Sequence, residues 1–162
     1  MSHATLQLFT DSSPWAVRTR SDVVANALAD RHYSRRKPGV GRVSGPGRAL
    51  VLVAPDERAL WVTSWPMFTP DGLDAWRCSV FRNESDRLSS DLIRSAMELT
   101  AELWAEARPR DGWATWVDRR RVTSSNPGYC FLRAGWWKDA TYEPGRRQRH
   151  LIRLRATIEG KI

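Results

Sequence analysis

Residues 111–137, DGWATWVDRRRVTSSNPGYCFLRAGWW, carry the pattern that decides the fold of this chain. Trp113 to Val117 is a β-branched and aromatic run of strand length. Asn126-Pro127-Gly128 opens a turn or a helix start, and residues 129–134 suit about one and a half helical turns before Gly135 ends them. A polar group at a strand end that faces a helix start is where α/β folds usually place chemistry. We therefore expect a site at the end of this strand.

The other elements follow outward from this stretch. The patterns predict a helix over 23–29 capped by Ser21-Asp22, and strands over 49–54 and 59–65 joined by a turn at 55–58. A further strand is predicted over 74–82, with Trp76, Cys78 and Val80 on one face. A long helix is expected to start at Ser89 or Ser90, with an apolar stripe through Leu92, Ala96, Leu99 and Leu103, and a last strand is expected over 151–156. Residues 1–20 are expected to form an N-terminal strand and entry loop, and residues 31–48 a basic, glycine-rich loop. Strands joined by crossover helices predict one α/β domain over residues 1–162, with a mixed central sheet and helices on both faces.

The chain is strongly basic, with 26 Lys and Arg against 18 Asp and Glu, a net charge of +8 and a pI near 10.5. This excess favours a polyanionic partner, and Arg pairs with phosphate in a bidentate way. No segment approaches the roughly 20 apolar residues of a membrane span, and no signal peptide opens the chain. We therefore expect a cytoplasmic protein without a membrane partner. Cys78 and Cys130 lack metal-ligand spacing and are expected to be buried thiols.

Basic residues gather in three predicted loops. They are Arg35, Arg36, Lys37 and Arg42 in the glycine-rich loop, Arg119, Arg120 and Arg121 after the strand at 113–117, and Arg146, Arg147 and Arg149 before the last strand. A single run of this kind is usually only a solvated face. Three runs in loops favour contacts to a phosphate backbone, provided that the fold brings them to one face.

Two residues are the first candidates for proton transfer. Asp118 follows a buried strand, where a carboxylate with a raised pKa serves as a base or as an orienting acceptor. The alternative is an aspartate that caps the loop and pairs with one of the arginines at 119–121. His32 is the histidine in a motif-like setting, and a neutral imidazole accepts a proton or binds a metal ion. No second His or Cys lies at ligand spacing, so a metal site at His32 would need carboxylates brought together by the fold.

Further polar side chains have two credible roles each. The phenols of Tyr33 and Tyr129 either donate to a developing charge or leaving group, or fill the core. Ser124 and Ser125 precede the short helix and either bind a phosphate or carbonyl, or cap the helix. These roles stay open at the level of the sequence.

The order of elements resembles the GNAT fold of acyl-CoA N-acyltransferases. The piece Asn126…Tyr129…Ala134-Gly135-Trp136 is similar to their late Asn…Tyr…Gly-aromatic segment. Ordinary GNAT enzymes carry a Gln/Arg-x-x-Gly-x-Gly/Ala loop before the long helix, whose amides bind the pyrophosphate of CoA. Here residues 81–90 read FRNESDRLSS and contain no glycine. Acetyl-CoA and another acyl donor therefore both stay open as the donor.

A narrower resemblance is to the Mom-like branch of that superfamily, phage proteins that modify adenine in DNA to protect it from restriction nucleases. The shared motifs are, in order, His32-Tyr33 after the first helix, Arg82-Asn83-Glu84 at a strand end, Asp118 after the next strand, and Tyr129…Gly135-Trp136. The resemblance implies a transferase that adds an acyl or glycyl-type, carbamoylmethyl-like group to the exocyclic amine of adenine in double-stranded DNA, in a host cytoplasm. The implied catalytic residues are His32, Tyr33, Asp118 and Tyr129, and the implied substrate-binding residues are Arg82, Asn83, Ser124, Ser125 and Asn126.

An enzyme that acts on a base in a duplex flips the base out and stacks it between flat side chains. Trp65 and Trp137, at loop edges, are the predicted stacking residues. The tryptophans expected in the core are Trp104, Trp113, Trp116 and Trp136. Two other functions stay open: an acyl-CoA-dependent N-acyltransferase for a small amine or protein, and a non-catalytic nucleic-acid-binding module on a degenerate GNAT scaffold. Association into a homodimer is open as well.

Overall fold

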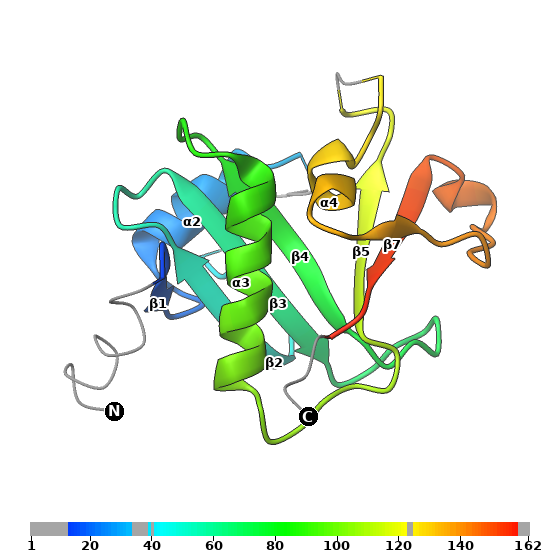
Figure 1. Cartoon of the computed structure of the whole chain (residues 1–162), viewed down its shortest axis with the longest axis horizontal. Coiled ribbons are helices and arrows are strands. Elements are labelled where there is room, and N and C mark those ends of the chain that lie inside the picture. The colour runs from blue at the N-terminus through cyan, green and yellow to red at the C-terminus, as the bar shows by residue number, and fades with distance from the viewer. Residues whose placement is uncertain (1–12, 34–38, 40, 123–124, 159–162) are drawn as a thin grey trace.

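The computed structural model describes residues 13–33, 39, 41–122 and 125–158 (Figure 1). Within these residues the centre is a seven-stranded mixed sheet of order β1-β2-β3-β4-β5-β7-β6. The strands are β1 (Ala16–Arg18), β2 (Gly47–Val53), β3 (Ala59–Pro66), β4 (Trp76–Asn83), β5 (Trp113–Asp118), β6 (Trp137–Lys138) and β7 (Leu151–Ala156). The helices are α2 (Val23–Asp30), α3 (Ser89–Leu103), α4 (Tyr129–Arg133) and the 3-10 helix η1 (Arg146–Gln148). The predicted α/β class is confirmed. None of the described helices has the length and apolar character needed to cross a bilayer.

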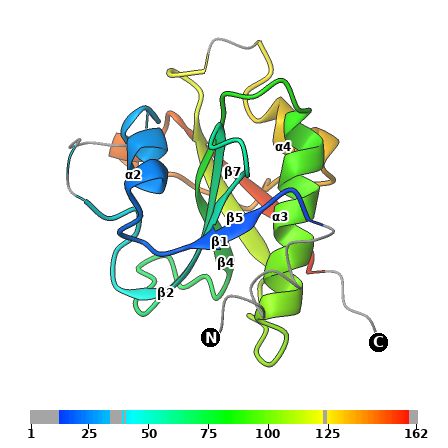
Figure 2. The same cartoon turned by 90° about the vertical axis from the view of Figure 1, so that its left-hand side faces the viewer.

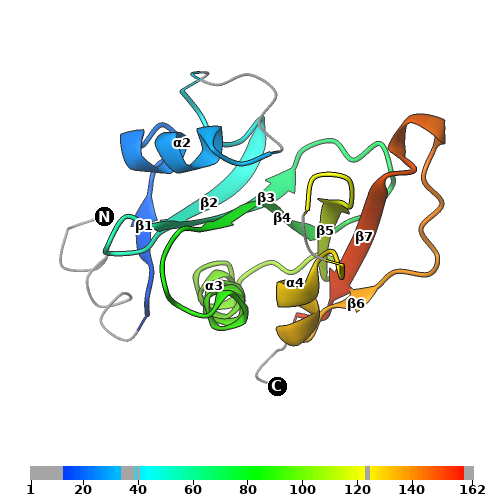
Figure 3. The same cartoon turned by 90° about the horizontal axis from the view of Figure 1, so that it is seen from above.

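Helices lie on both faces of the sheet, as predicted, with α2 on one side and α3 and α4 on the other (Figures 2 and 3). The apolar strands serve both faces because successive side chains alternate. In β2, Leu50 and Leu52 belong to the core under α3, whereas Val51 and Val53 pack with Leu28 of α2. The two layers explain why these strands read as continuous apolar runs.

The stretch at 111–137 folds as a strand, a loop and a short helix, as expected. Gly128 and Gly135 bracket α4, and both adopt a positive φ, of 78° and 97°. A Cβ atom at position 128 would lie 2.7 Å from Cδ1 of Leu154, so a glycine lets the helix start close to β7. The first helix also begins as predicted, because the carboxylate of Asp22 accepts a hydrogen bond from the backbone N–H of Ala25 at 2.9 Å.

A β-bulge interrupts β4. The register pairs Val62 with Val80 and then Thr63 with Cys78, so Ser79 is the extra residue. The bulge turns Val80 to the α2 side, while Cys78 stays in the core under α3. The prediction that Trp76, Cys78 and Val80 share one face is therefore wrong for Val80, because an alternating pattern does not reveal a bulge.

β4 and β5 are parallel neighbours along a short seam only. Their register consists of Trp76 with Trp113 and Arg77 with Ala114. Beyond this seam β5 keeps a full antiparallel ladder with β7, whereas the two parallel strands diverge toward the end where α4 lies (Figure 1). An opening therefore separates the carboxyl halves of β4 and β5.

Side chains replace the missing ladder bonds across this opening. The hydroxyl of Thr115 donates to the backbone carbonyl of Cys78 at 2.8 Å. At the wide end, the backbone N–H of Asp118 donates to the hydroxyl of Tyr33 in a long hydrogen bond of 3.5 Å. Buried backbone polar groups need partners, so the separation of the strands makes these two side chains structurally necessary.

On the α2 side, the described α-helix covers only part of the sheet. Among the described residues α2 packs against β2, β3 and β4, and no α-helix lies over β5 and β7 on this side (Figure 3). Alternation along these strands turns polar and charged side chains to it. We call this surface the open face; its residues are Arg77, Ser79, Trp116, Asp118, Leu151, Arg153 and Arg155.

Candidate functional site

His32 and Tyr33 follow the end of α2 and lie at the opening between β4 and β5. The backbone N–H of His32 donates to the carbonyl of Ala29 at 2.9 Å and so closes the last turn. The rings of His32 and Tyr33 stack with their centroids 4.4 Å apart. Both line a small cavity of about 50 Å³ that enters the opening and reaches Thr115 and Phe131. The predicted pair thus lies where the strands separate.

An ion-pair cluster ties the end of α2 to the end of β4. The Arg31 Nε donates to Glu84 at 2.7 Å, Arg82 pairs with the same carboxylate, and Arg82 Nη1 donates to the carbonyl of Arg31 at 2.7 Å. The hydrogen bonds from Arg31 and Arg82 lower the pKa of Glu84 to about 2. Burial, and then the charge of Arg82, lower the pKa of His32 to about 4. His32 is therefore a neutral imidazole at pH 7.

Asp118 is buried at the end of β5 and surrounded by basic side chains. Its carboxylate accepts from the backbone N–H of Arg120 at 3.0 Å and from Arg120 Nε at 3.3 Å. Arg121 lies 3.9 Å away and Nε2 of His150 3.8 Å away. The hydrogen bond from the Arg120 side chain lowers the pKa of Asp118, which corrects the expectation of a raised value. An anionic carboxylate in this place orients partners better than it removes protons.

The open face is hollowed beside Asp118 by a cavity of about 450 Å³. Its walls include Tyr33, Arg77, Ser79, Trp116, Asp118 and His150. Tyr33 and Trp116 also line the small cavity, so the two hollows form one site, which we call the β4–β5 cavity. Burial raises the pKa of Tyr33, so that its phenol stays protonated and can donate a hydrogen bond.

Other predicted site residues lie elsewhere. Tyr129 begins α4 with an exposed side chain and does not line the β4–β5 cavity in the part of the chain that is described. Its backbone N–H donates to the carbonyl of Asn126 at 3.1 Å, which makes Asn126 part of the helix start. Ser125 is exposed beside it. Ser124 lies outside the described residues.

Asn83 organises the loop before α3. Its Nδ2 donates to the carbonyl of Arg87 at 2.8 Å and to the hydroxyl of Ser89 at 3.0 Å, and its Oδ1 accepts from the backbone N–H of Ser85 at 2.9 Å. The backbone N–H of Arg87 donates to the Ser85 hydroxyl at 3.2 Å. These amides point into the loop itself, and the loop carries carboxylates at Glu84 and at Asp86. It therefore does not fit the pyrophosphate of CoA.

Two of the three basic runs lie side by side at the edge of the β4–β5 cavity. Arg119 Nη2 donates to the carbonyl of Arg149 at 2.9 Å, and the backbone N–H of Arg119 donates to the carbonyl of His150 at 3.0 Å. Arg146 and Arg147 are exposed on η1. In the third run Arg42 is exposed, and Arg35, Arg36 and Lys37 lie outside the described residues.

Among the cavity residues that were not predicted as site residues are His150, Trp116 and Arg77. His150 belongs to a cluster of arginines in the sequence, which hides its position beside Asp118. Trp116 was expected in the core, but its side chain is only half-buried and faces the cavity. Arg77 lies with Cζ 4.8 Å from the centroid of the Trp116 ring. The signal available was the spacing of two between Trp116 and Asp118, which puts both on one face of a strand.

The remaining tryptophans follow the predictions in part. Trp104, Trp113 and Trp136 are buried, as expected. Trp65 is half-buried, and its indole N–H donates to Asp74 at 3.1 Å. Trp137 is 45% exposed on β6.

The described residues show no metal site and no disulfide. No three His, Cys, Asp or Glu side chains gather there in an arrangement that would hold a metal ion, at His32 or elsewhere in the described chain. Cys78 and Cys130 are free thiols, buried and half-buried respectively, and burial raises the pKa of both. A structural role is what this environment favours.

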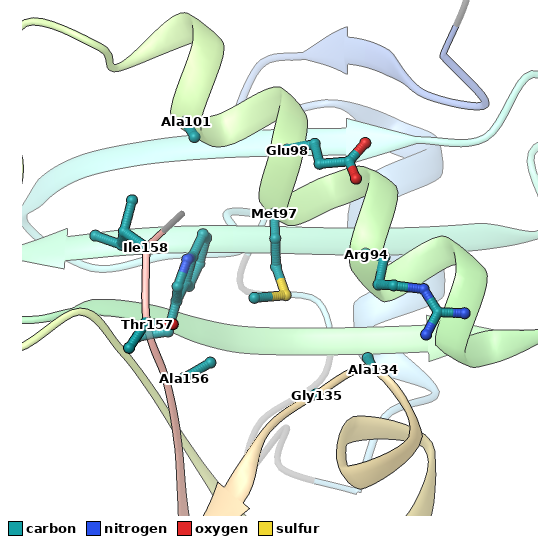
Figure 4. Close-up of a pocket in the computed structure, with 10 residues that line it drawn as sticks. Arg94, Met97, Glu98, Ala101, Ala134, Gly135, Ala156, Thr157 and Ile158 are labelled. Carbon is teal, nitrogen blue, oxygen red and sulfur yellow. The ribbon is translucent and has the colours of Figure 1, made fainter. Parts of the chain in front are cut away.

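A second hollow, of about 140 Å³, lies on the α3 side of the sheet (Figure 4). Met97 points from α3 into the hollow toward Thr157, which like Ile158 follows β7, whereas Glu98 and Arg94 lie on the opposite edge (Figure 4). None of the predicted site residues lines it. The sheet separates it from the β4–β5 cavity.

No protein-family model, no curated protein and no solved structure matches this chain. The fold and the site together define an α/β protein with an arginine-rimmed cavity at the divergence of two parallel strands.

Proposed function

We propose that this chain is a GNAT-like transferase that modifies the exocyclic amine of adenine in double-stranded DNA, in the manner of the Mom-like proteins that it resembles. The observation that carries the proposal is the convergence of His32, Tyr33 and Asp118 on one cavity. Tyr33 and Asp118 are 85 positions apart in the chain, and they meet through a hydrogen bond at the opening between β4 and β5. The resemblance to the GNAT fold supports the proposal through the order helix, hairpin, strand, long helix, strand, short helix and strand, to which the structure adds β1, β6 and η1.

The reaction that we propose needs a positioned amine and a proton acceptor. The N6 amine of adenine is a weak nucleophile because its lone pair is delocalised into the ring, so orientation and proton removal both lower the barrier. His32 is neutral and can accept the N6 proton as the bond to the donor's carbon forms. The leaving group of the donor departs with its electron pair.

Tyr33 and Asp118 support this step in different ways. The protonated phenol of Tyr33 donates a hydrogen bond to charge that develops on the donor. The Asp118 carboxylate, held anionic by Arg120, accepts a hydrogen bond from the amine. We assign the role of general base to His32, which is uncharged at pH 7, and the orientation of the acceptor to Asp118.

The charge distribution supports DNA as the partner. Arg120 and Arg121 stand at the cavity, and Arg119 adjoins Arg149 beside it. Guanidinium groups at the edge of a cavity suit contacts to phosphates that flank a target base. A duplex would then present its backbone to the rim and one flipped base to the interior.

Mass spectrometry of nucleosides from cells that express the protein tests the proposal. We expect a new adenosine derivative with the wild-type chain, and at least about 100-fold less of it with Asp118→Asn. Asp139→Asn is the matched control, since Asp139 is also a buried carboxylate held by two arginines, Arg153 and Arg155, but lies outside the cavity. It should lose comparable stability and keep the modification.

Two results would contradict the proposal. Folded wild-type protein that binds duplex DNA and leaves every base unmodified would favour the non-catalytic binding module. Folded protein that binds no DNA but binds acetyl-CoA in a calorimetric titration would favour an N-acyltransferase with another acceptor.

A further inference from the structure

Trp116 and Arg77 form a layered pair in the wall of the β4–β5 cavity. The Arg77 guanidinium lies over the indole at 4.8 Å. The loop before β4 holds it there, because Arg77 Nη2 donates to Asp71 at 2.9 Å and to the carbonyl of Leu73 at 3.2 Å. The pair is thus fixed from two strands and a loop, and both of its side chains line the cavity.

One atom of this pair has no hydrogen-bond partner. Among the described residues, Nε of Arg77 is a buried donor without an acceptor. A buried N–H without a partner costs free energy, and a ligand atom that reaches it recovers part of that cost. Arg77 and Trp116 line the same hollow, so the guanidinium layer that covers the indole belongs to the cavity wall.

We propose that the Arg77–Trp116 pair is the platform on which a nucleobase stacks after it leaves the duplex, an inference that rests on the proposed function. Aromatic rings and guanidinium planes are the two side-chain surfaces on which unpaired bases stack. At about 450 Å³ the larger hollow has the size of a small-molecule site. A base on this platform has its edge toward Asp118 and Tyr33, which line the same hollow.

The two tryptophans predicted from the sequence are less suited to stacking. Trp65 packs its ring edge-on against Trp76, 6.3 Å between centroids, and its N–H is engaged with Asp74. Trp137 is exposed, but it lines a hollow next to Arg110 and Ile158 and not the β4–β5 cavity. The assignment to Trp116 follows from its place beside the reacting groups.

Binding of two DNA duplexes tests the platform without any need for catalysis. One duplex carries a single unpaired adenine, and the other carries an abasic nucleotide at the same place. We expect the wild-type chain to bind the first about 10-fold more tightly, from stacking of the unpaired base. Trp116→Leu should abolish this preference and leave the affinity for the abasic duplex unchanged. Trp137→Leu is the matched control and should keep the preference.

Further variants keep the test decisive if Trp116→Leu does not fold. Trp116→Phe keeps a ring and should retain part of the preference, whereas Arg77→Met removes the guanidinium layer and should reduce it. Equal binding of both duplexes by the wild-type chain overturns the platform, and so does a preference that survives in Trp116→Leu. If the cells contain modified adenine and Trp116→Leu still prefers the duplex with the unpaired adenine, only the platform is contradicted. If the wild-type chain binds neither duplex, the proposed function is contradicted as well.

Discussion

At the scale of single residues, the ionisation of His32 makes the free energy of unfolding depend on pH. Its pKa lies at about 4 against an ordinary value of 6.5, first because of burial and then because of Arg82. The unfolded chain therefore takes up a proton near pH 6.5 that the folded chain refuses until about pH 4, so the free energy of unfolding falls as the pH is lowered through this window. The decrease amounts to about 2 to 3 kcal/mol at about pH 4.5.

The variant His32→Phe isolates this effect, because it keeps a ring against Tyr33 and removes the titration. Urea denaturation of both proteins at about pH 7.5 and about pH 4.5 should show that the wild-type chain is destabilised by about 2 to 3 kcal/mol more than the variant. An imidazole resonance of His32 that titrates near the ordinary value of 6.5 would contradict the prediction.

The sequence predicted the positions of the candidate site residues better than their ionisation. His32, Tyr33 and Asp118 were identified by type, order and place after an element, and they do converge. The low pKa of Asp118 depends on Arg120, which folds back on it, and such a loop geometry is not visible in a run of arginines. Trp116 was missed because aromatic residues in a strand are usually core.

At the scale of elements, Glu84 fixes the position of α2 relative to β4 and so of His32-Tyr33. We expect Glu84→Gln to cost less than about 1 kcal/mol in the free energy of unfolding, because the ion pairs with Arg31 and Arg82 are partly exposed. The rate of adenine modification should fall by about 10-fold or more, since small misplacements of catalytic groups are expensive.

Glu106→Gln is the control for this element-level effect. Glu106 pairs with Arg48 at 2.8 Å, is more exposed than Glu84, and lies away from the β4–β5 cavity. Thermal unfolding and modification rates are measured side by side. An equal decrease of activity in both variants would show that Glu84 has no positioning role.

Element boundaries were predictable where local chemistry sets them. The Asp22 cap starts α2 and Gly135 ends the segment around α4, and both were read from residue types alone. The bulge at Ser79 and the short strand β6 were not, since each depends on pairing with a distant strand. The divergence of β4 from β5 belongs to the same category.

At the scale of the whole molecule, the net charge of +8 predicts DNA binding that weakens steeply with salt. Combined replacement of Arg146, Arg147 and Arg149 by Ala should lower the slope of log K against log salt concentration by about 2 to 3, since each phosphate that an arginine neutralises adds about 0.9 to this slope. The control variant replaces three arginines that lie away from the open face, Arg94, Arg108 and Arg133. It should change the slope by less than about 1. Fluorescence anisotropy with a labelled duplex measures both, and equal effects would contradict an interface on the open face.

The short seam between β4 and β5 divides the sheet into two parts, β1 to β4 and β5 to β7, which pair with each other over a few residues only. Aromatic rings pack across this seam: the ring centroids of Trp76 and Trp113 lie 5.3 Å apart, and those of Trp61 and Trp113 lie 5.8 Å apart. In a complete ladder, separation of two neighbouring strands breaks the backbone hydrogen bonds along their whole length. Here a molecule that enters the gap meets side-chain links instead, namely the hydrogen bonds of Thr115 and Tyr33 and the Arg77–Trp116 pair. Separation of the carboxyl halves of β4 and β5 would therefore cost side-chain contacts and would leave the backbone ladders within β1 to β4 and within β5 to β7 unbroken.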